Sequence, residues 1–296
     1  MAAESTKTSS APNQSRISVG IGSWTDAEYT GLIFPKGVRS DERLKVYATR
    51  FDHVEVNSSY HAMPRRTWVE SWAKQTPAGF IFDFKLPRTF SEDPENSARD
   101  GALVSHLLQT TQPLLDEQKL GAFFLTLPPS FRPERRRLEE LDGLVEKLQP
   151  HTLAVEPRHR GWIEDEQRER TLDYFRTRKV VWIAVDMPRI EGSTIMPPVD
   201  EVTNPRLAYM RLHGRNKDWP NVKSAEERHT YQYAADELTE IAARVRALAE
   251  KADRVRVVAN NHAQDFAPKA ALALQQLLGL ERELPRPAED LLLPGF

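Results

Sequence analysis

The chain has 296 residues and a formal charge of −2 at pH 7, so nothing draws it as a whole toward nucleic acid or an anionic membrane. Binding of nucleic acid is therefore expected only if a local patch of positive charge provides it. Because cysteine is absent, disulfides, thiolate metal sites and a cysteine nucleophile are excluded. No stretch approaches the roughly 18 apolar residues of a membrane helix, and the first 15 residues lack a signal-peptide core. We expect a cytoplasmic protein without a membrane partner.

Short apolar runs recur along the chain and predict eight strands. In chain order they span 17–24, 53–57, 80–86, 121–128, 152–158, 180–186, 207–214 and 254–261. Helical spacing of apolar residues lies between them, most clearly over 44–51, 138–148, 225–251 and 267–278. Eight alternations of strand and helix predict parallel βαβ units.

Eight such units predict an α/β fold of the (β/α)8 TIM-barrel type, formed as a single domain by residues 17–279. Residues 1–16 are expected to be a flexible, disordered arm, and 280–296 a C-terminal tail. No glycine-rich phosphate fingerprint follows the first strand, which removes the main support for a dinucleotide fold.

Polar and aliphatic residues separate by parity within the predicted strands. If Glu156 points into the barrel, Ala154 does too, while Leu153 and Val155 face the helices. The same test sorts the other strands, and it predicts an unusually polar lumen. The polar set is His53, Glu55, Asn57, Asp83, Lys85, Thr126, Glu156, Asp186, Arg211, His213 and Asn260.

Most of these residues lie at the carboxyl ends of their strands, where TIM barrels build their sites. The candidate catalytic residues are Glu55, Glu156, His159, Asp186 and His213. The candidate substrate-binding residues are Trp24, Asn57, Tyr60, Lys85, Arg158, Arg211, Arg215, Asn260, Asn261 and His262. A structural role stays open beside the functional one, since buried charges must pair. Asp83 and Arg256 could belong to a neutralised plug, and His159 could cap the following helix.

Three chemistries fit this set of residues. Glu156, Asp186 and His213 could hold a divalent metal, the one cofactor the sequence allows for, although Lys85 and the arginines would repel it. A carboxylate paired with a histidine could instead do acid–base work without metal. The cations and aromatic residues together would suit a phosphate with a sugar or base beside it.

The strand ends carry motifs that resemble the YecE-like family, also called domain of unknown function 72, which has a TIM-barrel fold. The resemblance covers about residues 17 to 279. Its motifs include "YATRFDHVEVNSSYHAMP" (47–64), "LGAFFLTLPPSF" (120–131), "AVEPRHRGW" (154–162), "YMRLHGR" (209–215) and "VVANNHAQDFAPKAA" (257–271). Thr126, Pro157 and His262 stand where the family usually has glutamine, phenylalanine and aspartate.

The resemblance implies a fold and a cup-shaped site without an established reaction. The barrel is similar to those of the xylose-isomerase-like and endonuclease-IV-like superfamily, in which metals act on sugars or phosphodiesters. Our leading hypothesis is an enzyme that acts on an anionic, phosphorylated sugar or nucleotide-like ligand in the barrel mouth. The alternatives are a metal-dependent phosphodiester hydrolase or lyase, and a non-catalytic module that binds a ligand or nucleic acid. The oligomeric state is left open.

Overall fold

The computed structural model describes residues 16–219, 221–222, 224–261 and 263–280. The predicted arm and tail fall almost entirely on residues 1–15 and 281–296, which lie outside the described residues. His262 lies outside them too.

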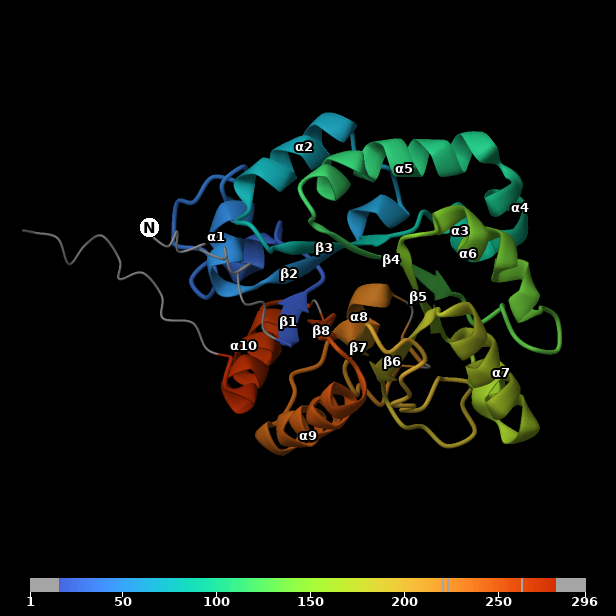
Figure 1. Ribbon diagram of the computed structural model, residues 1–296. Coiled ribbons are helices and arrows are strands. Elements are labelled where there is room, and N and C mark those ends of the chain that lie inside the picture. The colour runs from blue at the N-terminus through green and yellow to red at the C-terminus, as the bar shows by residue number, and fades with distance from the viewer. Residues whose placement is uncertain (1–15, 220, 223, 262, 281–296) are drawn as a thin grey trace, which may run out of the picture.

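Eight parallel strands close into one barrel, with the strands in chain order around it (Figure 1). The strands are β1 (Ile17–Ile21), β2 (His53–Val56), β3 (Ile81–Lys85), β4 (Leu120–Leu127), β5 (Thr152–Pro157), β6 (Val181–Asp186), β7 (Ala208–Leu212) and β8 (Val255–Ala259). Parallel pairing of β1 with β8 closes the ring. The predicted TIM barrel is confirmed.

Helices surround the barrel and cover the outer face of its strands (Figure 1). They are α1 (Arg43–Arg50), α2 (Arg66–Gln75), α3 (Arg88–Glu92), α4 (Pro94–Arg99), α5 (Gly101–Asp116), α6 (Asp142–Leu148), α7 (Asp165–Arg178), α8 (Ala225–His229), α9 (Ala235–Lys251) and α10 (Phe266–Leu278). In α9 the residues Leu238, Ile241, Val245 and Leu248 recur at three- and four-residue spacing and are all buried. This stripe attaches the helix to the barrel wall.

The segment between β6 and β7 departs from the expected alternation, because residues 187–207 contain no helix. Four prolines fall in this segment, and proline cannot donate the backbone hydrogen bond of a helix interior. The loop is held against β6 instead. The Trp182 indole donates to the carbonyl of Val199 at 3.0 Å, and Thr203 accepts from the Trp182 backbone at 2.8 Å.

The predicted helix over 225–251 is wrong as one element, since α8 and α9 are separated by residues 230–234. The break sends Tyr233 inward, where it is buried and its hydroxyl donates to Asp186 at 2.9 Å. The start of α9 is capped by Glu237, whose carboxylate accepts a hydrogen bond from the backbone N–H of Ala234 at 2.9 Å. The polar contact of Tyr233 thus interrupts a sequence with good helix propensity.

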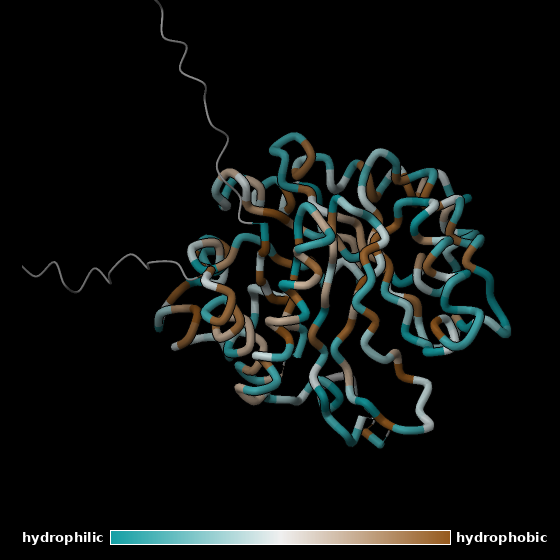
Figure 2. The backbone as a smooth tube through the Cα atoms, turned by 60° about the horizontal axis from the view of Figure 1, so that its bottom comes forward, coloured by the Kyte–Doolittle hydropathy of each residue, from teal (hydrophilic) through white to brown (hydrophobic). Residues whose placement is uncertain are grey.

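Hydropathy follows the barrel architecture. In Figure 2 short hydrophobic and hydrophilic stretches alternate along the central strands, as expected when one strand face meets helices and the other a polar lumen. Within the described residues, no helix combines the length and apolar character needed to cross a membrane.

Candidate functional site

Arg211 at the carboxyl end of β7 lies at the centre of the upper barrel lumen. Its Nε and Nη2 each donate to Glu55 of β2 at 2.8 Å, and its Nη1 donates to Glu156 of β5 at 2.5 Å. Because β2 and β5 are not neighbours of β7 in the sheet, these contacts cross the lumen. All three side chains are at most 1% exposed, so their charges interact in a poorly solvated site.

A second polar layer lies below Arg211. The Tyr209 hydroxyl is 2.9 Å from a Glu55 oxygen and 3.1 Å from an Asp83 oxygen. Asp83 also pairs with Arg256 of β8 and accepts from the backbone of Ala122 at 2.8 Å. Asp83 is fully buried and Arg256 is 10% exposed, and each is held by the other, which favours a structural role for the pair.

Glu156 also binds Arg158 and His213. The Arg158 Nε donates to it at 2.7 Å, and the His213 Nε2 lies 3.2 Å away. Burial raises the pKa of Glu156, but Arg211, His213 and Arg158 together outweigh it and the pKa falls well below the usual range. Glu156 is therefore a carboxylate at neutral pH.

His213 is a neutral imidazole that supports Glu156. Burial lowers its pKa to about 4 despite the attraction of Glu156. A neutral ring that donates from Nε2 to a carboxylate leaves Nδ1 as an acceptor, and Nδ1 lies 3.2 Å from the Asn260 amide nitrogen. Both ring nitrogens are engaged and the side chain is fully buried. This geometry positions Glu156 and does not present His213 to a ligand.

Lys85 ends β3 beside this charged group and forms no ion pair with any of the described residues. Its Nζ lies 4.5 Å from the centre of the Tyr60 ring and 5.8 Å from that of Phe124. Burial, followed by the positive charges of Arg211 and Arg158, lowers its pKa to about 7. Lys85 thus exchanges between ammonium and free amine at neutral pH.

A cavity of about 630 Å³ opens at the carboxyl ends of β1 and β2. Trp24, Trp68 and Trp72 supply aromatic walls, while Glu55 and Asn57 supply polar groups. This volume lies within the range of roughly 300–1,000 Å³ typical of small-molecule sites. Trp68 is 54% exposed, so one aromatic face is open to solvent.

Lys85 does not line this cavity, but it ends β3, the strand next to β2, which supplies Glu55 to the cavity wall. Val56 pairs with Phe84, so the next residues, Asn57 and Lys85, follow at the ends of neighbouring strands. The turn from Ser58, which lines the cavity, leads to Tyr60, whose ring contacts the Lys85 ammonium group.

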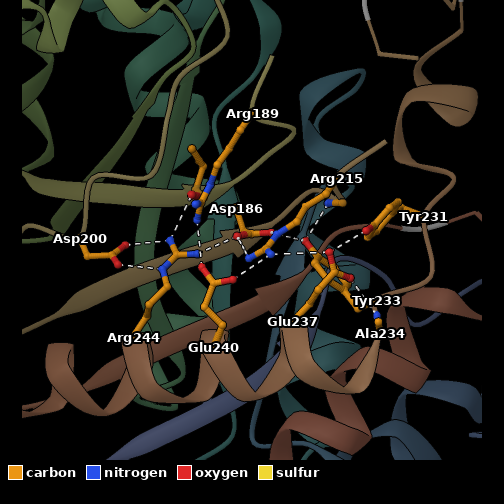
Figure 3. A network of polar contacts seen from close by, with 12 residues as sticks. Asp186, Arg189, Asp200, Arg215, Tyr231, Tyr233, Ala234, Glu237, Glu240 and Arg244 are labelled. Carbon is orange, nitrogen blue, oxygen red and sulfur yellow. Dashed lines mark hydrogen bonds and ion pairs between the residues drawn. The ribbon is translucent and has the colours of Figure 1, made fainter. Parts of the chain in front are cut away.

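Asp186 belongs to a separate network, although the strand parity predicted it in the lumen group. Arg215 donates to both carboxylate oxygens at 2.8 and 2.9 Å, and Arg244 donates to one at 2.7 Å. Figure 3 shows Asp186 between the two arginines, with Arg244 rising from α9. Arg244 also binds Asp200, and Arg215 binds Glu240. The network joins the helix-free loop to α9.

We expect Arg244→Met to lower the free energy of unfolding by about 1–2 kcal/mol, because Asp186 keeps Arg215 while Asp200 loses two hydrogen bonds. Chemical denaturation at pH 7 measures this loss. Arg189→Met is the matched control, since Arg189 is 61% exposed, and its loss should stay below about 0.5 kcal/mol. Equal losses in both variants would contradict the structural role of Arg244.

The remaining predicted residues have local partners. His159 Nδ1 accepts from the backbone of Gly161 at 3.2 Å, so it caps the turn Arg160–Ile163, and Asn261 donates to the carbonyl of Tyr231 at 2.8 Å. His262 lies outside the described residues.

The three residues that could have held a metal, Glu156, Asp186 and His213, do not come together at one site. No group of three His, Asp or Glu in the described part of the chain is arranged to hold a metal ion. Asp186 is held by Arg215 and Arg244, while Glu156 and His213 contact each other. The residues present therefore do not fit the expected Glu156–Asp186–His213 site.

Sequence reasoning missed several residues that shape the site. Tyr209 and Phe124 share the strand parity of Arg211 and Thr126, so the parity test could have included both. Gly22 leaves room for Asn57 and Asn260, since a Cβ there would lie 2.7 Å from both side chains and would displace them. No local signal identifies Arg244, which reaches Asp186 from a different element.

Comparison with known proteins places these features in a family. The family model described as "Protein of unknown function DUF72" matches residues 18–291. The UPF0759 protein YunF of Bacillus subtilis is 26% identical over 276 residues, which cover 90% of this chain and 95% of YunF. The UPF0759 protein YecE of Escherichia coli K12 is 31% identical over 158 residues, 53% of this chain and 54% of YecE.

Two solved structures share the fold. A DUF72 family protein from Enterococcus faecalis superposes with a TM-score of 0.81 at 25% identity, covering 92% of this chain and 99% of its own. A DUF72 family protein from Thermotoga maritima superposes with a TM-score of 0.78 at 27% identity, covering 89% and 99%.

Proposed function

The chain belongs to the DUF72 family, and from this premise we propose that it is an enzyme for a small anionic, hydroxylated ligand bound in the barrel mouth. A phosphorylated sugar or a nucleotide-like molecule has this chemistry. The proposal rests on the charge balance around Lys85, on the cavity beside it and on the aromatic walls of that cavity.

The charge of the lumen group carries the proposal. Among the described residues, the carboxylates Glu55, Asp83 and Glu156 are matched by the guanidinium groups of Arg158, Arg211 and Arg256. Protonated Lys85 adds a positive charge without an ion-pair partner. A bound phosphate would supply the missing negative charge, and Arg158, whose side chain is 25% exposed, is a second cation that could contact it.

The cavity would hold the uncharged part of the ligand. Trp24 and Trp68 offer apolar faces on which a sugar ring or a base packs. Asn57 offers polar atoms for hydroxyl groups, while Glu55, which also lines the cavity, accepts from Arg211 through both oxygens and supplies a fixed negative charge there. Arg211 and His213 are positioning residues here, since their polar atoms are engaged with Glu55 and Glu156.

Titration calorimetry with paired ligands tests the proposal. We expect ribose 5-phosphate, glucose 6-phosphate or AMP to bind more tightly than ribose, glucose or adenosine, and the preference to weaken with salt. Lys85→Met should weaken binding of the phosphorylated partner by about tenfold, equivalent to about 1.4 kcal/mol, with little effect on the neutral one.

Lys74→Met on α2 is the matched control and should bind as the unchanged protein does. Mass spectrometry of the bound ligand after incubation separates turnover from binding alone. Equal affinity for phosphorylated and unphosphorylated partners would contradict anion recognition, while an unaltered ligand would assign the site to a binding module.

A further inference from the structure

The amino group of Lys85 is placed among aromatic rings and cations, with no acidic partner. In the described part of the chain, no carboxylate oxygen lies within 4.0 Å of its Nζ. The Tyr60 ring covers it from the turn after β2, and Phe124 of β4 lies on the inner side. The side chain is only half-buried, so its end is within reach of a ligand.

The carboxylates near Lys85 are already paired with arginines, which explains why Lys85 does not form a salt bridge with them. Glu55 on β2 is occupied by Arg211, and Glu156 on β5 is occupied by Arg211 and Arg158. Burial is the main reason that the pKa of Lys85 falls to about 7, and Arg211 and Arg158 lower it further because they repel the proton more than the two carboxylates attract it. A substantial fraction of the molecules therefore carries a free, nucleophilic amine at neutral pH.

We propose that Lys85 forms a Schiff base with the carbonyl group of an anionic carbonyl compound in the barrel mouth. This rests on the proposed function and narrows its ligand to one that carries an aldehyde or ketone beside its acidic group.

The reaction needs no oxidant, reductant or metal. The neutral Nζ attacks the carbonyl carbon, a C–N bond forms, and the electron pair of the C=O bond moves to oxygen. The oxygen takes one proton from the amine and one from solvent and leaves as water, so a protonated imine remains. This imine carries a positive charge beside Arg211 and Arg158, and the ligand's own negative charge offsets it.

Reductive methylation tests the amine without assuming any ligand. Formaldehyde forms an imine with a free amine, and sodium cyanoborohydride reduces it to a stable methylamine that peptide mass spectrometry locates. At pH 7 the fraction of free amine at a pKa of about 7 exceeds that of an ordinary lysine roughly a thousandfold. We expect Lys85 to react at least about tenfold faster than exposed Lys74 and Lys147, because low basicity also reduces nucleophilicity.

The pH profile and unfolding provide the internal controls. The rate at Lys85 should level off above about pH 7, whereas the rates at Lys74 and Lys147 keep rising. In guanidinium chloride the preference for Lys85 should vanish. Equal rates for the three lysines in the folded protein would overturn the inference, while the proposed function would still stand or fall with the phosphate titration.

Trapping with anionic carbonyl compounds tests the ligand class. Dihydroxyacetone phosphate or pyruvate, reduced in place with cyanoborohydride, should label Lys85 at least about tenfold more than neutral dihydroxyacetone does. Lys85→Arg keeps a positive charge and should abolish the adduct, while the matched control Lys74→Arg should keep it. Absence of an adduct with both anionic compounds would overturn the inference, even if methylation favoured Lys85.

Discussion

Replacing Arg211 with methionine is expected to lower the free energy of unfolding by about 3–5 kcal/mol, among the largest effects of any single change in this protein. Arg211 is 1% exposed and donates three hydrogen bonds to Glu55 and Glu156. Methionine fills much of the volume but leaves a buried carboxylate at Glu55 without its cation. Glu156 keeps Arg158 and His213, so most of the loss arises at Glu55. Urea denaturation at pH 7, followed by circular dichroism, measures the change.

A double variant isolates the cause of this loss. Adding Glu55→Gln to Arg211→Met removes the unpaired charge and should recover about 1–3 kcal/mol relative to the sum of the single losses. Arg88→Met is the matched surface control, since Arg88 is 66% exposed in its pair with Glu92 and should cost below about 1 kcal/mol. A loss in Arg211→Met as small as that control would show that the lumen pair contributes little to stability.

The barrel and its polar lumen were predictable because they follow from short-range rules. Alternation of strand and helix fixes the class of fold, and side-chain parity assigns Glu55, Lys85, Glu156 and Arg211 to one face. The carboxyl-end rule then gathers them at the mouth. Each step uses only a residue's position within its own strand.

The pairing of charges was not predictable in the same way. Asp186 obeys the parity of its strand, yet Arg215 and Arg244 hold it in a different network. Which cation reaches which carboxylate depends on the curvature of loops and on the rotation of α9, and neither is written in strand periodicity. The break before α9 has the same origin, since the inward contact of Tyr233 with Asp186 is tertiary, whereas the missing helix over 187–207 follows from its four prolines.

Two buried histidines should make the protein lose stability in mild acid. His53 is 1% exposed, and neither of its ring nitrogens has a hydrogen-bond partner among the described residues. Burial, reinforced by Arg256, lowers its pKa to about 3, and the pKa of His213 is about 4. In the unfolded chain both return to about 6.5, so between pH 6.5 and about pH 4 the unfolded state binds more protons. Stability therefore falls as pH falls through this window.

The expected loss from pH 7 to pH 5 is about 2 kcal/mol for each histidine. His53→Leu removes one of the two titrating groups and should reduce the loss of stability by that amount. His106→Leu, at an exposed position of α5, should leave the loss unchanged. Urea denaturation at both pH values measures the difference. The pKa values of Glu156 and Asp186 are lowered in the folded state, so these carboxylates stabilise the fold until the pH falls below about 4. Their effect on stability can therefore be separated from that of the histidines. If His53→Leu lost as much stability as the unchanged protein, protonation of His53 could not be what opposes folding in mild acid, and the acid sensitivity would have to arise at other groups, among them His213 and His151.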